Sequence, residues 1–171
     1  FLPPMDLPHK FDIEKPGFLV PVVSSELYRK YKHMAQGSMD SVKEVAVKVD
    51  QEFKEEFVRG YGVVEAIMVE DAEIVLVTAG SITSTTRLVV RDLRDRGQKI
   101  GLLKIRLFRP FPVEAVRDVL KGKERIAVID RNISLGSGGI FCQELRAALI
   151  HSPDHPLTYG YIAGVGGTDV T

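Results

Sequence analysis

The segment that decides the fold is "AEIVLVTAGSITSTTRLVVRDLRDRGQKIGLLKIRLF", residues 72–108. It opens with a continuous apolar run at 72–81 that ends in Gly-Ser, and such a run bounded by turn residues is typical of a buried strand. Residues 82–97 predict a helix that ends at a glycine, and residues 99–108 predict a second strand. A strand, a helix and a strand in this order predict a parallel βαβ unit.

The same alternation continues toward the C-terminus. It predicts a helix at 112–121, a strand at 125–130, a helix at 140–152 and a strand at 157–164. Pro112 lies at the start of the first of these helices and Gly122 lies just past its end, which is the usual asymmetry of helix ends. We therefore predict an α/β fold with three layers, in which helices cover both faces of a mostly parallel sheet.

The chain before this domain has a different composition. Residues 1–24 hold five of the nine prolines and predict an extended arm, because proline removes backbone donors and biases the residue before it toward extended conformations. Residues 25–60 predict a helical connector, with Gly37 separating a short first helix from a longer one that Asp40 or Ser41 caps. The α/β domain is then predicted to span residues 61–171.

Charge and cysteine content restrict the function classes. The 23 basic and 23 acidic side chains give a net charge of zero and interleave along the chain, whereas a nucleic-acid binder usually has a basic excess. Cys142 is the single cysteine, so neither an internal disulfide nor a cysteine-bound cluster can form within this chain. The apolar runs are too short to cross a bilayer, and the first residues lack the pattern of a signal peptide. We predict a cytoplasmic protein with no nucleic-acid or membrane partner.

Candidate site residues follow from the predicted sheet, because ligands of such sheets lie beyond the carboxyl ends of the strands. Three motifs fall there, "TAGS" at 78–81, "RPFP" at 109–112 and "DRNISLGSGG" at 130–139. The last leads into a helix, whose first N–H groups are expected to be free for an anion. Its spacing matches neither the phosphate loop nor the dinucleotide fingerprint, and a tight turn packed on a neighbouring domain is the alternative. The candidate anion or interdomain contacts are Arg109, Arg131, Ser134, Gly136, Ser137 and Gly138.

Two further motifs favour structural roles. In "GSITSTT", residues 80–86, Ser81 or Thr83 is expected to cap the following helix. "HSPDH", residues 151–155, contains potential metal ligands, but its prolines predict a loop in which the two histidines are poorly placed, so we predict no metal site. The sequence also offers no arrangement of a nucleophile and a general base, and we predict no catalytic residue in this chain.

Three segments together carry a family resemblance: residues 70–112, "IAVIDRNISLGSGG" at 126–139, and "GYIAGVGGTDVT" at 160–171. They resemble the C-terminal part of the alpha subunit of pyruvate:ferredoxin oxidoreductase, in the 2-oxoacid:ferredoxin oxidoreductase family. The likeness extends over residues 1–171. It implies a transketolase C-terminal-like domain, and Thr168 stands where an arginine is common in relatives.

The resemblance also implies a function for a larger assembly. Such enzymes, also called pyruvate synthases, oxidatively decarboxylate pyruvate with coenzyme A to acetyl-CoA, carbon dioxide and reduced ferredoxin. Their thiamine diphosphate, magnesium and iron–sulfur clusters are expected in a pyrimidine-type domain, a beta subunit and a ferredoxin-like subunit. This chain, with no cofactor of its own, would then be an assembly domain that is inactive alone.

Related enzymes for branched-chain oxo acids or oxalate remain alternatives to the pyruvate enzyme. The C-terminal domain of another thiamine enzyme is a second alternative. A stand-alone module that binds a nucleotide or coenzyme A at the glycine-rich loop is a third.

Overall fold

The computed structural model describes residues 11–17, 22–154, 156–168 and 170. The chain divides into two units, residues 1–37 and residues 38–171, and each unit is described here by itself. Most of the predicted arm, residues 1–24, lies outside the described residues, and the predicted domain boundaries stay predictions.

The long helix α1, Ser25–Phe57, extends through both units without interruption. The expected break at Gly37 is therefore wrong: one glycine costs a helix about 1 kcal/mol, which neighbouring good helix formers can offset. The expected cap at residues 40 and 41 is wrong as well, because the helix begins after Ser24, whose hydroxyl accepts the N–H of Leu27 at 3.3 Å. No residue of α1 is buried.

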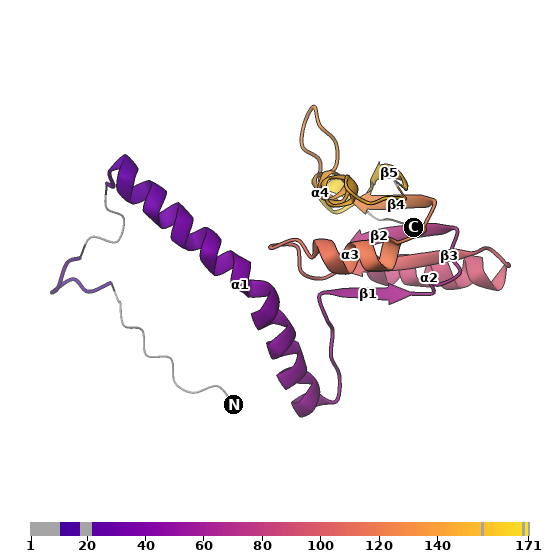
Figure 1. Ribbon diagram of the computed structural model, residues 1–171, viewed down its shortest axis with the longest axis horizontal. Helices are drawn as coiled ribbons and strands as arrows, with labels where there is room; N and C mark the ends of the chain where they lie inside the picture. The colour runs from indigo at the N-terminus through magenta and orange to yellow at the C-terminus, as the bar shows by residue number, and fades with distance from the viewer. Residues whose placement is uncertain (1–10, 18–21, 155, 169, 171) are drawn as a thin grey trace. The chain divides into compact units, whose positions relative to one another are not determined.

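The second unit contains a five-stranded sheet with the order β1-β3-β2-β4-β5 (Figure 1). Its strands are β1, Val64–Ile67; β2, Ile74–Ala79; β3, Ile100–Ile105; β4, Arg125–Asp130; and β5, Leu157–Ile162. β1 pairs with β3 in antiparallel orientation, and all other neighbouring strands are parallel. The predicted mostly parallel α/β sheet is confirmed. The sequence did not reveal β1, because four residues are too few for a periodic pattern.

Helices α3, Val113–Leu120, and α4, Ile140–Leu149, pack on one face of the sheet and on each other. Apolar side chains that alternate along β2, β3 and β4 point to this face and join the two helices in one core, as the period of two in a strand requires. The core includes Val75, Val77, Leu103, Ile105, Val116, Leu120, Ile126, Val128, Phe141 and Leu145.

Helix α2, Ile82–Asp95, contacts β2 and β3. Buried Leu102 of β3 and Val90 of α2 lie outside the main core cluster. Buried polar groups also join helix and sheet, because the hydroxyls of Thr78 in β2 and Thr83 in α2 lie 2.9 Å apart and form a hydrogen bond. This bond fixes the first turn of α2 against the end of β2, where the candidate site is built.

Edge strand β1 is held by a half-buried charge cluster around Glu65. Its carboxylate accepts from Arg87 of α2 at 3.1 Å and from Arg106, which follows β3. Burial alone would raise the pKa of Glu65, but the hydrogen bond from Arg106 and the nearby positive charges together lower it below its ordinary value. The cluster therefore stabilises the antiparallel strand with a charge-assisted contact.

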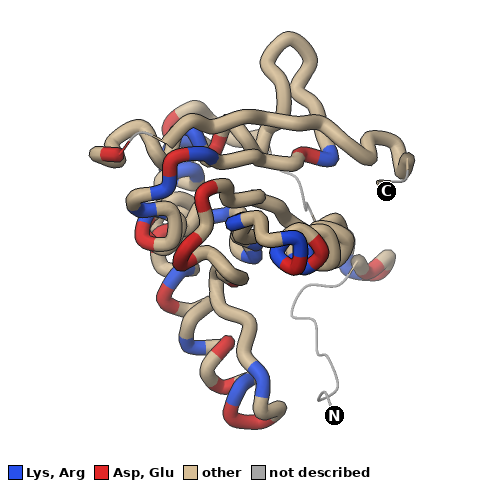
Figure 2. Tube along the Cα trace, turned by 90° about the vertical axis from the view of Figure 1, so that its right-hand side faces the viewer, with Lys and Arg blue, Asp and Glu red and all other residues tan. Residues whose placement is uncertain are grey.

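Acidic and basic residues are interspersed along the trace of the described chain (Figure 2). The segment between Arg131 and Glu144 carries no Lys, Arg, Asp or Glu. Within the described residues, none of the helices is both long and apolar enough to cross a membrane.

Candidate functional site

The carboxyl ends of β2 and β4 form the point at which ligands are expected in such a sheet. The chain continues from β2 to β3 on one side of β2, whereas β4 lies on its other side, so the direction of the sheet order reverses between β2 and β4. Open α/β sheets place ligands in the crevice at this reversal. Two strand-to-helix connections meet here, Gly80–Ser81 before α2 and residues 131–139 before α4.

The first turn of α4 is completed by side chains from its own domain. The carboxylate of Asp130, which is 2% exposed, accepts the N–H of Phe141 and the N–H of Cys142, each at 2.9 Å. The amide oxygen of Asn132 accepts the N–H of Ile140 at 3.0 Å, and the N–H of Gln143 bonds to the carbonyl of Gly139. The N–H groups of Ile140, Phe141 and Cys142, three of the four that a helix start leaves without an intrahelical partner, thus have acceptors within the domain. This differs from the expectation of N–H groups free for an anion.

Gly139 is required by the same arrangement. A Cβ atom at this position would lie 2.1 Å from Oδ2 of Asp130, although the backbone itself is in an ordinary extended conformation with φ −69°. The glycine therefore permits the buried carboxylate to approach the helix start. The glycine-rich sequence that suggested an external anion serves an internal one.

The loop at 131–139 stands away from the sheet as a short hairpin (Figure 1). Ser134 and Gly138 form an isolated antiparallel bridge, and the side chain of Gln143 donates to both oxygens of Ser137. Gly136 and Gly138 have φ of +79° and +93°, the left-handed region that favours glycine. Ser134, Gly136, Ser137 and Gly138 therefore shape the loop. Leu135 at its tip is 89% exposed.

Arg109 lies at the same edge of the sheet but at a distinct place. Its guanidinium stacks 4.2 Å from the ring of Phe108 and donates to Glu144 of α4 at 2.5 Å. The side chain is 49% exposed, so part of the charge still faces solvent. The predicted roles of Arg109, Arg131, Ser134, Gly136, Ser137 and Gly138 in anion or interdomain contacts stay predictions.

Arg131 turns away from the loop toward the start of α2. It donates to the hydroxyl of Ser81 at 2.8 Å, and two of its nitrogens lie 3.3 and 3.4 Å from the carbonyl of Gly164. The hydroxyl of Ser81, expected to cap the helix, makes no cap bond there. A pocket of about 240 Å³ opens beside this arginine and is lined by Ser81, Ile82, Thr85, Arg131, Gly167, Thr168 and Val170.

Sequence reasoning missed this pocket, although it named Arg131. Thr85 and Thr168 were not among the predicted site residues, and Ser81 was assigned to a cap. The signal available in the sequence was the hydroxyl-rich "GSITSTT" after a strand. Only the register of β2, β4 and β5 brings that motif near Arg131 and Thr168.

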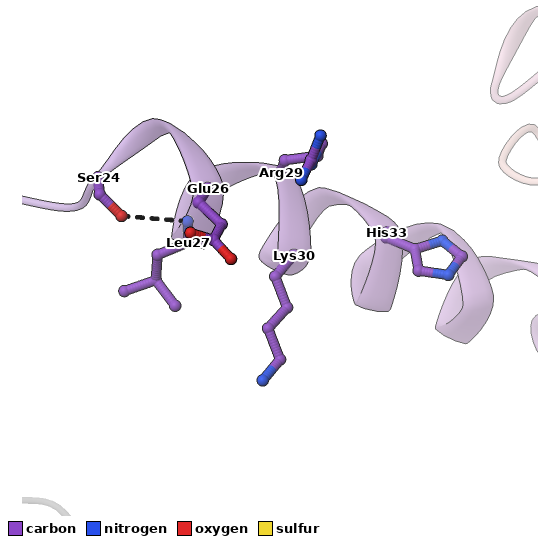
Figure 3. Close-up of a pocket in the computed structure, with 6 residues that line it drawn as sticks. All are labelled: Ser24, Glu26, Leu27, Arg29, Lys30 and His33. Atoms are coloured by element: carbon purple, nitrogen blue, oxygen red, sulfur yellow. Dashed lines mark hydrogen bonds between the residues drawn. The ribbon is translucent and has the colours of Figure 1, made fainter.

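A larger hollow in the first unit does not form a comparable site. It lies along the first turns of α1, and Figure 3 shows the side chains of Arg29, Lys30 and His33 pointing in different directions rather than toward a common centre. Five of the six residues that line it belong to α1, and the sixth is Ser24, which directly precedes the helix.

The described residues do not supply a donor set for a metal or cluster. Among them, no group of three or more His, Cys, Asp or Glu side chains lies close enough to hold a metal ion. Cys142 is buried against Gly160, and burial raises the pKa of its thiol above the ordinary value.

Comparisons with known proteins identify relatives of this domain. The family model for pyruvate:ferredoxin oxidoreductase core domain II matches residues 72–171. The pyruvate synthase subunit PorA of Methanothermobacter thermautotrophicus is 36% identical over 100% of this chain, which corresponds to 44% of the relative. PorA of Thermotoga maritima is 37% identical over 93% of this chain and 41% of the relative. The ketoisovalerate oxidoreductase subunit VorA of Pyrococcus abyssi is 34% identical over 100% of this chain and 44% of the relative.

A solved structure shares the fold. It is the 2-oxoglutarate:ferredoxin oxidoreductase from Magnetococcus marinus with 2-oxoglutarate, coenzyme A and succinyl-CoA bound. The match has a TM-score of 0.52 at 18% identity and covers 85% of this chain and 22% of that chain. The chain thus spans less than half the length of these relatives. With more than half of its residues matched by the family model, the chain belongs to the pyruvate:ferredoxin oxidoreductase core domain II family.

Proposed function

We propose that this chain is part of the alpha subunit of a 2-oxoacid:ferredoxin oxidoreductase and supplies an assembly domain to that enzyme. The complete enzyme would oxidatively decarboxylate a 2-oxo acid, most plainly pyruvate, with coenzyme A to the acyl-CoA, carbon dioxide and reduced ferredoxin. The observation that carries the proposal is the match of residues 72–171 to the family model. Identity of 36% over the whole chain to a pyruvate synthase subunit supports it.

The cofactors and partners belong to the same proposal. Thiamine diphosphate, magnesium and iron–sulfur clusters would reside in other domains and subunits of a cytoplasmic complex, where thiamine diphosphate supplies the electron sink for decarboxylation. The partners would be a pyrimidine-type domain, a beta subunit and a ferredoxin-like subunit. The identity of the oxo acid needs experiment, because subunits of a pyruvate synthase and of a ketoisovalerate oxidoreductase match this chain almost equally, at 36% and 34% identity.

The assembly role is supported by the shape of the loop at 131–139. Leu135 is 89% exposed at the tip of a hairpin that internal hydrogen bonds hold in one conformation. A preformed apolar tip loses little entropy when it enters a pocket on another domain. Arg109 lies at the same edge of the sheet, in contact with Phe108 and Glu144, and its guanidinium is half exposed. We place both in the contact with neighbouring domains.

The test is a native purification under anoxic conditions of the protein tagged at its own locus. We expect mass spectrometry to find a thiamine enzyme beta subunit and a ferredoxin-like subunit. Reduction of ferredoxin should require coenzyme A and one of pyruvate, 2-ketoisovalerate or 2-oxoglutarate. Recovery of the chain only as a free 19.0 kDa monomer, with no activity toward any of the three acids, would refute the proposal.

The interface is tested separately with Leu135→Ser. Loss of a buried leucine contact should weaken the association about thirtyfold, because burying such a side chain contributes about 2 kcal/mol. Leu88→Ser is the matched control, since Leu88 is 65% exposed on α2 and away from the loop. Arg109→Ala should also reduce the recovery of partner subunits more than it lowers the domain's thermal stability. Equal recovery in all variants would remove the loop and Arg109 from the interface.

A further inference from the structure

We propose that the pocket around Arg131 binds a small tetrahedral oxyanion, with inorganic phosphate as the simplest case. Its polar lining consists of the guanidinium of Arg131 and the hydroxyl groups of Ser81, Thr85 and Thr168. This inference does not rest on the proposed enzyme, because it requires only the fold of the second unit. It also differs from the site expected from the sequence at the glycine-rich loop. There the carboxylate of Asp130 accepts the N–H groups of Phe141 and Cys142 at the start of α4.

The pocket is assembled from three separate strand ends. Ser81 and Thr85 follow β2, Arg131 follows β4, and Gly167 and Thr168 follow β5. The pocket therefore lies at the carboxyl edge where the order of the sheet reverses, which is the favoured ligand position in open α/β sheets. The guanidinium and the hydroxyls of Ser81 and Thr85 offer several donors to one small acceptor, whereas the hydroxyl of Thr168 donates to the carbonyl of Val165 at 3.1 Å.

The charge of Arg131 is not neutralised within the described part of the chain. Its hydrogen-bond acceptors there are the hydroxyl of Ser81 and the carbonyl of Gly164, both uncharged. Arg94 and Arg109, by contrast, each donate to a carboxylate. A guanidinium without a carboxylate partner beside a polar pocket suits an oxyanion, since its planar fork donates two parallel bonds.

The guanidinium is nevertheless held in position before any ligand arrives. Gly164 has φ +71°, and a Cβ at this residue would lie 3.0 Å from Nε of Arg131. The glycine thus lets the chain after β5 approach the arginine closely enough for its carbonyl to accept from the side chain. Together with the bond to Ser81 at 2.8 Å, this contact orients the arginine toward the pocket.

The size of the pocket limits the ligand. A volume of about 240 Å³ is below the range of about 300–1,000 Å³ that is usual for drug-sized ligands. A phosphate ion with some water fits this space, whereas a whole nucleotide does not. A phosphate monoester could place only its phosphate group here. Free phosphate is therefore the expected ligand, and coenzyme A serves as the phosphate ester in the titration below.

The experiment is calorimetric titration of the 171-residue chain at constant ionic strength with phosphate, sulfate, acetate and coenzyme A. We expect phosphate to bind with a Kd of about 1 mM, as suits one charge-assisted pair and a few neutral hydrogen bonds. Sulfate should bind comparably and acetate at least several-fold more weakly. Equal binding of acetate would overturn the tetrahedral assignment. Much tighter binding of coenzyme A would assign the pocket to an esterified phosphate instead.

Variants connect the binding to the pocket. Arg131→Gln should weaken the binding of phosphate about tenfold or more. Ser81→Ala, which keeps the positive charge of Arg131, should weaken it several-fold. The matched control is Arg146→Gln, because Arg146 also donates to a neutral carbonyl, that of Thr158 at 2.8 Å, but does not line the pocket. Circular dichroism confirms that each variant is folded. Equal affinities in Arg131→Gln and Arg146→Gln would overturn the proposal.

One further variant tests whether the chain supplies its own anion. Asp169, which follows Thr168 in the sequence, lies outside the described residues. We expect the parent chain and Asp169→Asn both to bind phosphate. Binding by Asp169→Asn alone would mean that an internal carboxylate competes for the pocket, which overturns the proposal for the natural sequence. Absence of binding in both chains would overturn it as well.

Discussion

Helices α2 and α4 both begin where a parallel strand ends, but their first turns are completed in different ways. At α4, the buried carboxylate of Asp130 lies under the helix start and accepts two backbone N–H groups. At α2, the hydroxyl of Ser81 makes no cap bond and accepts from Arg131 instead. One helix start is closed by an internal anion, and the other lies beside a pocket and a cation that has no carboxylate partner among the described residues.

The difference shows why a glycine-rich turn before a helix is weak evidence for a ligand. The turn with the richer glycine pattern, residues 136–139, leads into the helix whose first N–H groups, at Ile140, Phe141 and Cys142, have acceptors within the domain. Glycines there permit the loop conformation and the approach of Asp130. A helix start can be assigned to a ligand only after the acceptors within the domain have been accounted for.

The largest effect should come from Asp130→Asn, which keeps the shape of the side chain. The N–H groups of Phe141 and Cys142 donate to two different oxygens of Asp130, so in the amide one of them would face the NH₂ group, which is itself a donor. The conflict should lower the free energy of unfolding of the domain by about 3 kcal/mol, as expected when buried bonds to a charged group are lost. Hydrogen exchange of amides in β2 and β4 measures this loss in the second unit alone.

The control for this substitution is Asp118→Asn on the exposed side of α3. Exposed substitutions away from special contacts usually stay within about 0.5 kcal/mol. If Asp130→Asn proves equally mild, the carboxylate does not close the start of α4. The contrast between the two helix starts would then be lost.

Gly139→Ala should have the next largest effect. The added Cβ would lie 2.1 Å from Oδ2 of Asp130, so either the carboxylate or the helix start must move. Such overpacking typically costs about 1–3 kcal/mol, and we expect about 2 kcal/mol by the same exchange measurement. The backbone φ of −69° suits alanine, so a loss of this size reports the steric conflict alone. An unchanged stability would show that the loop moves freely away from Asp130.

Most of the sheet and its helices could be predicted from the sequence, because periodicity and helix-end residues are local signals. The prediction for residues 125–130 coincides with β4, and the other predicted strands contain the observed ones. β1 escaped because an antiparallel edge strand of four residues has too little pattern. Gly37 was overestimated as a helix breaker because its cost of about 1 kcal/mol is small beside a helix of 33 residues.

The candidate site could be predicted only in part. The sequence placed Arg109, Arg131 and the glycine-rich loop at the carboxyl edge of the sheet, because that placement requires only that the strands preceding them run parallel. It could not indicate that Asp130 folds under α4, because a buried carboxylate and a solvated one look alike in a sequence. The pocket at Ser81, Thr85 and Thr168 depends on the pairing of three distant strands.

Gly80→Ala and Gly136→Ala sharpen the comparison, because they perturb the two connections in the same way. Both glycines have positive φ, +70° and +79°, and a Cβ at either would meet nothing within 4 Å. Each substitution should therefore cost only the conformational strain of a non-glycine residue, about 1 kcal/mol. Thermal unfolding followed by circular dichroism can compare them directly. A much larger loss for either variant would reveal a contact that this geometry does not predict.

The smallest effect should come from Ser81→Ala. A serine that caps a helix usually contributes about 1 kcal/mol, but Ser81 makes no cap bond, so we expect a loss below about 0.5 kcal/mol. Its counterpart is Asn132→Ala, which removes the acceptor for the N–H of Ile140 at 3.0 Å and should cost about 1 kcal/mol. Urea titration of both variants under identical buffer without phosphate measures this difference. If Ser81→Ala is the more damaging of the two, the hydroxyl of Ser81 stabilises the start of α2, and the two helix starts are closed alike. If Asn132→Ala is the more damaging, Ser81 is free to serve the pocket, because its bond to Arg131 positions the cation without carrying the fold.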